Sequence, residues 1–263
     1  MILDTLAQGS RERAARKKAA VALDEIKSRA LVLSCNTGFP FEAALQKEGI
    51  SYICEVKKAS PSKGIIAEDF PYLTIAKEYE QAGAAAISVL TEPDYFLGSD
   101  RYLEEIAKSA AIPVLRKDFT VDEYQIYEAK TLGAAAVLLI CSLLDYKTLK
   151  YYLEICDMLG LSALVEAHTA EETDMAVKAG ARIIGVNNRN LKTFDVDVSN
   201  CARLRSLVPD GILFVAESGV KTPADIDSLR NTGADAVLIG ETLMKSSDKK
   251  TALEILNGGA LNE

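Results

Sequence analysis

The 263-residue sequence contains no tryptophan, seven phenylalanines and a single histidine, His168. With so few large aromatic side chains, the core has to be built from Ala, Val, Ile and Leu, as in a buried parallel sheet. A metal site built from imidazole ligands needs more than one histidine. We therefore expect neither a metal ion nor another cofactor.

The cysteines are also few, and Cys35, Cys54, Cys141, Cys156 and Cys201 are scattered along the chain. Their number is odd and no two have CxxC spacing, which argues against a disulfide framework or a zinc site and favours a reducing compartment. No apolar run approaches the ~18 residues of a membrane span, and residues 1–6 are too short for the apolar part of a signal peptide. We expect a cytoplasmic protein without a membrane partner.

Positive charge is scarce as well, since 30 Lys and Arg stand against 38 Asp and Glu and the net charge is −8. A nucleic acid needs a basic face and is not expected as a partner, although a few local lysines can hold a small anion. Basic residues do gather in residues 3–31, which have a helical pattern. We interpret Arg11, Arg13, Arg16, Lys17 and Lys18 as the solvated face of one helix rather than as an arm that attracts a substrate or a nucleic acid.

A pattern with a period of roughly fifty residues is present four times, at Gly83, Gly133, Gly180 and Gly233. In each copy the glycine follows a helical pattern and can end that helix in a left-handed conformation. An apolar run then follows, as expected for a strand buried on both faces. Because the period is twice the length of one strand–helix unit, a further strand should lie midway between successive glycines.

Apolar segments do occupy these gaps, and another precedes the first glycine. Eight strands are therefore predicted, near residues 53–57, 85–90, 113–117, 136–140, 162–166, 183–187, 213–217 and 236–239. Three helix starts agree with this spacing. Thr120 with Glu123 and Thr169 with Glu172 fit the capping box, and Thr222 precedes a proline at the first helical position.

Eight βα units predict an α/β protein, a (β/α)8 TIM barrel with an N-terminal helical extension. Such barrels run to about 250 residues as one unit, so we expect a single domain over residues 1–263, with the extension in 1–50 and the barrel in 51–263. Residues 39–49 are predicted to form a short helix that covers one end of the barrel. A doubly wound sheet is the alternative, but no GxGxxG turn follows the first strand.

Polar side chains stand at the ends of the predicted strands, where the active site of such a barrel lies. They are Glu55, Lys57, Lys117, Glu166, Asn187 and Glu217. Because charged groups at buried strand ends are costly unless paired or used, their convergence favours a catalytic cluster over separate ion pairs. Lysine can donate a proton and glutamate can accept one, which predicts acid–base chemistry without a metal. We interpret His168 as a loop residue near this mouth rather than as the general base.

A phosphate site is expected between the loops after the seventh and eighth strands. Ser218-Gly219 and Gly240-Glu241 stand there, and glycines let backbone N–H groups approach an anion closely. Ser60 and Lys63, after the first strand, could offer a hydroxyl group and a cation to the same anion. An ordinary loop explains that segment equally well.

Motifs in the same regions resemble those of indole-3-glycerol-phosphate synthases. They are CEVKKASPSKG at 54–64, SVLTE at 88–92, YFLGS at 95–99, PVLRKDF at 113–119, LVEAH at 164–168, IGVNNRNL at 184–191, ESG at 217–219 and GETLM at 240–244. The resemblance covers nearly the whole chain, including the N-terminal extension. It departs at no catalytic position, and Ala167, where the family often has valine, is an apolar replacement.

The resemblance implies conversion of 1-(2-carboxyphenylamino)-1-deoxyribulose 5-phosphate to indole-3-glycerol phosphate, carbon dioxide and water in tryptophan synthesis. Lys117 would then be the general acid of ring closure, and Glu166 would take part in proton transfer with the leaving hydroxyl group. Lys57 would lie near the substrate carboxylate and has also been assigned as an acid in the family. Glu55 and Asn187 would orient the lysines and the substrate, and Glu217 would be a further active-site carboxylate.

The same resemblance extends to substrate binding. It assigns Ser60, Gly219, Gly240 and Glu241 to the phosphate loops, beside Ser218, and it places Phe96, Leu139 and Arg189 in the substrate pocket. The expected partner is a small phosphorylated substrate. We expect a monomer or a weak oligomer, with association with other enzymes of the tryptophan pathway left open.

Two alternatives remain at this point. A different phosphate-binding barrel, such as the isomerase one step earlier in the pathway, would need a Cys or Asp acid–base pair at strand ends, and Cys54 has no evident partner. A barrel that binds the phosphate ester without reacting is the second alternative. The complete set of strand-end residues argues against it.

Overall fold

The computed structural model describes residues 2–189, 197 and 199–258. Eight parallel strands close into a barrel in the order β1-β10-β9-β8-β7-β6-β5-β4. They are β1 (Ser51–Val56), β4 (Ala86–Leu90), β5 (Val114–Lys117), β6 (Ala136–Ile140), β7 (Ser162–Ala167), β8 (Ile183–Asn187), β9 (Leu213–Glu217) and β10 (Ala236–Ile239). This confirms the α/β class, the (β/α)8 TIM barrel and the predicted strands to within two residues. The doubly wound alternative is wrong.

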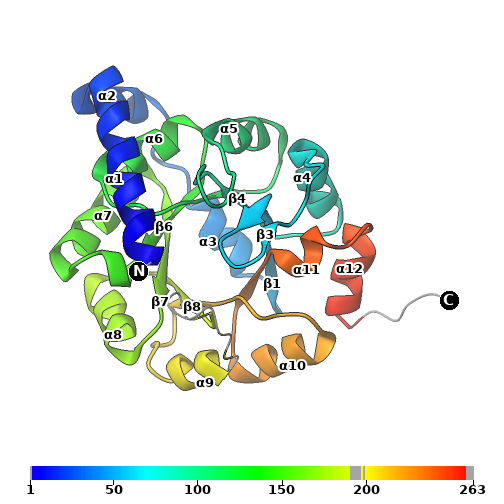
Figure 1. Cartoon of the computed structure of the whole chain (residues 1–263). Coiled ribbons are helices and arrows are strands. Elements are labelled where there is room, and N and C mark those ends of the chain that lie inside the picture. The colour runs from blue at the N-terminus through cyan, green and yellow to red at the C-terminus, as the bar shows by residue number, and fades with distance from the viewer. Residues whose placement is uncertain (1, 190–196, 198, 259–263) are drawn as a thin grey trace.

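Helices surround the strands in a ring, with α1 lying across one face of it (Figure 1). They are α1 (Ile2–Ala20), α2 (Leu23–Val32), α3 (Pro40–Leu45), α4 (Tyr72–Gln81), α5 (Asp100–Ser109), α6 (Glu123–Thr131), α7 (Tyr146–Leu159), α8 (Ala170–Ala179), α9 (Ser199–Arg205), α10 (Pro223–Thr232), α11 (Glu241–Met244) and α12 (Lys249–Leu256), with a 3-10 turn η1 (Cys141–Leu143). A short hairpin of β2 (Ala59–Ser60) and β3 (Gly64–Ile65) follows β1. In the part of the chain described here, no helix has the length and apolar character needed to cross a membrane.

Strand side chains alternate between an inner core and a helix-facing core, as the two-residue period of a strand requires. The inner core contains Ile53, Leu115 and Leu164, and Phe41 and Leu45 of α3 pack into it. Both α3 side chains are fully or almost fully buried. The prediction of a short helix over one end of the barrel is therefore confirmed, and it covers the end at which the strands begin.

The four repeat glycines have positive φ angles of 89° at Gly83, 86° at Gly133, 93° at Gly180 and 80° at Gly233. Each follows a helix and precedes a barrel strand, so the left-handed helix ends are confirmed. Thr222 also caps α10 as predicted, with a proline in the first turn.

The two predicted capping boxes fit less well. Thr169 caps α8 by accepting a hydrogen bond from the backbone of Glu172, but the Glu172 carboxylate accepts one from residue 168 instead of returning it to Thr169. The box of Thr120 with Glu123 is wrong, since α6 begins at Glu123 and Asp122 caps it. Both Asp and Thr can cap, and the charged Asp122 next to the helix also interacts favourably with its dipole.

Residues 3–31 of the N-terminal extension lie in two helices, α1 and α2, rather than in the one helix predicted there. The break is at Ala22, whose φ and ψ angles of −60° and 153° are those of an extended residue. This turn lets α2 pack against α6 on the outside of the barrel. A helical sequence period alone does not show such a break, because the positions on both sides keep the same apolar spacing.

The sequence suggested that the basic face of α1 is solvated. In the structure, part of this face contacts carboxylates of the barrel. Arg13 Nη2 lies 3.0 Å from Asp118 Oδ1, and Arg13 Nη1 lies 3.3 Å from Glu92 Oε1. Lys17 pairs with Asp100 and Glu128, and Lys18 pairs with Asp122. Only the interpretation of Arg11 and Arg16 as exposed residues holds. The error arose because the acidic partners are about a hundred residues away in the sequence.

Replacing Arg13 with alanine should therefore destabilise the protein. Glu92 and Asp118 are almost fully buried. Loss of Arg13 would leave Asp118 with only the more distant Arg116, at 3.9 Å, and would remove the cation beside Glu92, at a cost of about 3 kcal/mol in the free energy of unfolding. Urea denaturation measures this change, and Arg16→Ala, on the exposed face of the same helix, is the control. Equal stabilities of the two variants would show that the ion pairs do not anchor α1.

Candidate active site

One cavity occupies the end of the barrel at which the strands finish, with a volume of about 690 Å³. This volume is typical of small-molecule sites. The side chains predicted to be catalytic all line it, namely Glu55, Lys57, Lys117, Glu166, Asn187 and Glu217. The structure therefore brings together the groups that acid–base chemistry requires, while the role of each remains a prediction.

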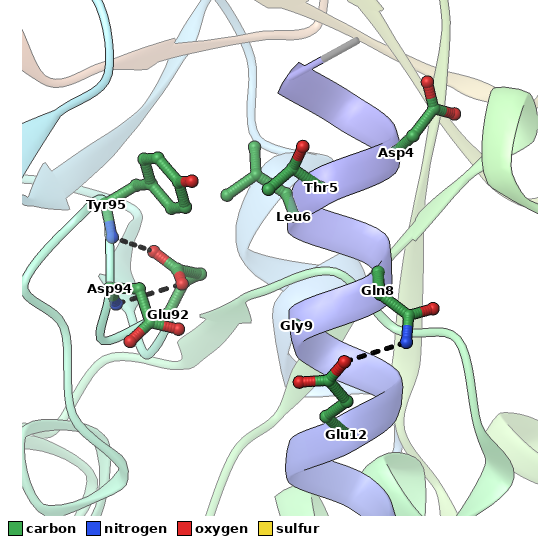
Figure 2. Close-up of a pocket in the computed structure, with 9 residues that line it drawn as sticks. All are labelled: Asp4, Thr5, Leu6, Gln8, Gly9, Glu12, Glu92, Asp94 and Tyr95. Atoms are coloured by element: carbon green, nitrogen blue, oxygen red, sulfur yellow. Dashed lines mark hydrogen bonds between the residues drawn. The ribbon is translucent and has the colours of Figure 1, made fainter.

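A second cavity, of about 700 Å³, lies between α1 and the loop after β4 (Figure 2). Its lining carries the carboxyl groups of Asp4, Glu12, Glu92 and Asp94, and none of the described residues that line it is basic. Figure 2 shows Glu92 accepting hydrogen bonds from the backbone N–H groups of Asp94 and Tyr95. This carboxylate therefore stabilises the loop to which it belongs. Such a lining would repel an anion, and the cavity at the strand ends is therefore the candidate active site.

Lys117 stands between two carboxyl groups at the end of β5. Its Nζ atom lies 3.8 Å from Oε2 of Glu166 and 3.8 Å from Oε2 of Glu217. Burial favours the neutral amine, but the charges of Glu217, Glu166 and Glu55 outweigh it and raise the pKa of Lys117. The side chain is therefore an ammonium group at neutral pH, able to donate a proton into the cavity.

The two carboxyl groups beside Lys117 have pKa values displaced in opposite directions. Burial raises the pKa of Glu217, and the nearby charge of Glu166 raises it further. Burial also disfavours ionisation of Glu166, but interactions with His168 and Lys117 outweigh it and lower the pKa of this group. One buried acid thus keeps its proton while its neighbour is ionised, an arrangement that suits paired acid and base roles.

Two glycines give these side chains room. A Cβ atom at Gly185, in the middle of β8, would lie 2.2 Å from Oε1 of Glu217. A Cβ atom at Gly240, after β10, would lie 2.6 Å from Oε1 of Glu55 and 2.8 Å from Nζ of Lys57, which form an ion pair with each other. Burial opposes ionisation of Glu55, but Lys57 and Lys117 lower its pKa. Gly185 was not singled out from the sequence, although a glycine inside a strand is a known sign of close approach.

His168 does not lie free in the loop after β7. Its Nε2 atom lies 3.3 Å from Oε1 of Glu166, and its Nδ1 atom lies 3.4 Å from Oε2 of Glu172. Burial lowers the pKa of the imidazole, but the two carboxylates raise it to about 10. The ring is therefore an imidazolium at neutral pH, which sets it apart from the general base that the sequence left as an alternative.

The residues predicted to bind phosphate lie together on one side of the cavity, at Ser60, Ser218, Gly219, Gly240 and Glu241. Lys63 lines it too, as do Lys221 and Lys245, which the sequence did not single out. The carboxylate of Glu241 is 2.7 Å from Nζ of Lys245 and 3.9 Å from Nζ of Lys63. The motifs at 217–219 and 240–244 end before these two lysines, since Lys221 lies in the loop before α10 and Lys245 is the C-cap of α11.

Two of the three residues predicted to form the substrate pocket line the cavity, and the third does not. Phe96 and Arg189 line the cavity. Leu139 does not, because it is fully buried in the helix-facing core. Its neighbours Leu138 and Ile140 line the cavity instead. The error is one of strand alternation, in which a shift of one residue moves a side chain to the other face.

The first turns of α1 complete the cavity. Ile2, Leu3 and Leu6 are part of its lining, although the sequence alone assigned no site residue to the extension. The helix that Arg13 anchors to the barrel therefore also supplies an apolar wall of the candidate site.

Asn190 and Leu191, the last two residues of the motif at 184–191, lie outside the described residues.

Comparison with known sequences gives a family match over residues 3–256, to a model described as indole-3-glycerol phosphate synthase. A protein named indole-3-glycerol phosphate synthase from Ruminiclostridium cellulolyticum is 58% identical over 260 residues, which cover 99% of this chain and 100% of that protein. Another protein of that name, from Endomicrobium trichonymphae, is 56% identical over 248 residues, which cover 94% of this chain and 96% of that protein.

Solved structures with the same architecture are far more distant in sequence. A 3-hexulose-6-phosphate synthase is 16% identical with a TM-score of 0.62, and the match covers 80% of this chain and 99% of that one. A tryptophan synthase alpha-subunit from Pyrococcus furiosus is 17% identical with a TM-score of 0.60, and the match covers 79% of this chain and 98% of that one. At this identity the likeness shows the barrel fold alone.

Replacing Gly185 with alanine should force Glu217 out of its position. The added methyl group overlaps the carboxylate, so we expect a loss of about 2 kcal/mol in the free energy of unfolding. In a Glu217→Ala background the same substitution should cost less than half as much, because the clashing group is gone. Urea denaturation of the four proteins of this cycle tests the contact, and an equal cost in both backgrounds would contradict it.

Proposed function

The chain belongs to the indole-3-glycerol phosphate synthase family, whose members are carboxy-lyases, and we propose that it closes the indole ring by Lys/Glu acid–base catalysis. The proposed substrate is 1-(2-carboxyphenylamino)-1-deoxyribulose 5-phosphate, and the products are indole-3-glycerol phosphate, carbon dioxide and water. One observation carries the chemistry of this proposal: the Lys117 ammonium lies between two buried carboxyl groups, 3.8 Å from each.

Ring closure requires a proton for the ketone oxygen. As the aromatic carbon that bears the carboxylate attacks the ketone carbon, Lys117 donates a proton to the developing alkoxide. Breaking of the bond to the carboxylate then releases carbon dioxide and restores the aromatic ring. The buried carboxylates around Lys117 hold its ammonium in a fixed position, so little reorganisation is needed as the charge develops.

Dehydration then removes a hydroxyl group and a proton from neighbouring carbons of the new ring. An acid has to protonate the leaving hydroxyl group and a base has to accept the carbon-bound proton. We assign the proton transfer of this step to Glu166, with Glu217 as the second carboxyl group within reach of Lys117. The opposite displacements of their pKa values support a division into acid and base.

The two ends of the substrate are both anionic. We place the phosphate group against Ser60, Ser218, Gly219, Gly240 and Glu241, through backbone N–H groups in the last two cases. Lys57, held by Glu55, would face the substrate carboxylate, and Asn187 would help to orient it. Fixing both ends of a flexible chain favours ring closure, because the entropy of orientation is lost on binding rather than in the reaction.

The isomerase alternative has no support in the side-chain arrangement. Cys54 is fully buried in the helix-facing core. Burial raises the pKa of its thiol, so it does not suit acid–base chemistry. A barrel that binds without reacting differs from an enzyme only in its products, and a direct assay separates the two.

Lys117→Ala should reduce product formation from the proposed substrate by at least about 100-fold, since it removes the general acid. The absorbance and fluorescence of the indole product measure the rate, and circular dichroism checks that the variant is folded. Lys178→Ala removes an exposed lysine of α8 and serves as the control with unchanged activity. Substrate binding by the wild type without any product would contradict the proposal and favour a binding barrel.

A further inference from the structure

The two carboxyl groups beside Lys117 are placed almost symmetrically. Oε2 of each lies 3.8 Å from Nζ of Lys117, and the Glu166 and Glu217 side chains are both 2% exposed. Two carboxylates that share a buried site do not readily ionise together, so one of them keeps a proton. The position of Lys117 does not determine which of the two carboxyl groups keeps the proton, because its Nζ atom is equally far from both.

A difference between them lies on the side away from Lys117. Oε1 of Glu166 faces Nε2 of His168 at 3.3 Å, as an ion-pair contact rather than a hydrogen bond. Oε1 of Glu217 is instead buried against Gly185 and, among the described residues, has no hydrogen-bond partner. The imidazole ring is fixed in turn by Glu172. This carboxylate lies 3.4 Å from Nδ1 and also accepts a hydrogen bond of 2.6 Å from the backbone N–H of His168.

We propose that His168 is a positioning residue for Glu166: an imidazolium ring, clamped between Glu172 and Glu166, that selects Glu166 as the anionic member of the pair beside Lys117. Glu217 then keeps the shared proton. The inference deepens the proposed function and rests on it for its catalytic meaning, because it assigns Glu166 as the group that accepts a proton and Glu217 as the group that can supply one.

The remaining charged and polar groups around the clamp do not all act equally on the two acids. Glu166 is faced by Lys117 from β5, Glu217 from β9, Asn187 from β8 and, further away, Glu55 from β1. Lys117 acts on both carboxyl groups, whereas the Asn187 side chain lowers the pKa of Glu166 and Glu55 raises the pKa of Glu217. Both effects act in the same direction as His168, which supplies the cationic contact to Oε1 of Glu166.

His168 itself is faced by few other groups among the described residues. Cys141 of η1 places its thiol 3.6 Å from the backbone oxygen of Glu172, and burial raises the pKa of that thiol to about 12. Asn200 of α9 donates to the His168 backbone oxygen at 3.4 Å. Both groups are uncharged at neutral pH, which leaves Glu166 and Glu172 to hold the imidazolium.

The chain has one histidine, so the charge of the clamp can be read directly by NMR. In untagged, nitrogen-15-labelled protein, the imidazole signals report His168 without assignment. We expect the ring to remain an imidazolium at pH 8, far above its ordinary pKa of about 6.5. A titration midpoint near 6.5 in the wild type would overturn the proposal.

Glu172→Gln removes the outer half of the clamp and should lower the midpoint of His168 by at least about one pH unit. Glu171→Gln is the matched control, because it removes an exposed carboxylate from the same first turn of α8 and so alters the helix dipole interaction in the same way. Equal midpoints in these two variants would show that Glu172 does not hold the ring.

His168→Gln removes the positive charge and should raise the pKa of Glu166, because a neutral neighbour no longer favours the carboxylate. The acid limb of kcat against pH should therefore move upward by about one unit, so that kcat on the acid side of the limb falls about tenfold while the plateau value of kcat and KM stay within twofold of the wild type. A merely structural role would lower activity without moving the limb, and that result would overturn the proposal.

The two proposals can fail separately. If the wild type makes no indole product, the proposed function is wrong, yet the NMR titration still tests the clamp. If the wild type is active and Lys117→Ala is not, while His168 titrates at its ordinary pKa, the function stands and the clamp is wrong.

Discussion

The ammonium group of Lys117 interacts with all three glutamates that are buried at one end of the barrel, and Lys57 and His168 add a cation beside Glu55 and Glu166. A carboxylate without a partner is costly to remove from water, and Glu55, Glu166 and Glu217 are all almost fully buried. Interactions with these three groups raise the pKa of Lys117 in return. The cluster is thus a single electrostatic unit, in which the protonation of each member depends on the others, and the catalytic proposal depends on this coupling.

The backbone of the barrel has to leave space for that unit. Gly185 and Gly240 lie where a methyl group would overlap the Glu217 carboxylate or the Glu55–Lys57 pair, so the positions of the charges are set by the strands and not by the loops alone. Rigid strands of this kind hold catalytic groups more closely than mobile loops can. The same constraint explains why a small residue stands in the middle of an otherwise bulky strand.

Much of this arrangement could be predicted from the sequence, because it follows from local periodicity. The glycine-punctuated repeat placed all eight barrel strands, and the strand ends then gave Lys117, Glu166 and Glu217. What the sequence missed depends on distant contacts or on single-residue register. The carboxylates that bind Arg13 and Lys17 lie far along the chain, and Leu139 was assigned to the cavity when its neighbours line it.

His168 shows why such a residue is hard to interpret without coordinates. Its position after β7 suggested either a loop residue or a general base, and both readings treat it alone. In the structure its effect comes from two glutamates, one at the strand end and one in the first turn of α8. Glu172 appeared in the sequence as half of a capping box, but its carboxylate turns to His168 instead. The helix cap and the catalytic cluster are therefore joined, and the first turn of α8 bears on which acid beside Lys117 is ionised.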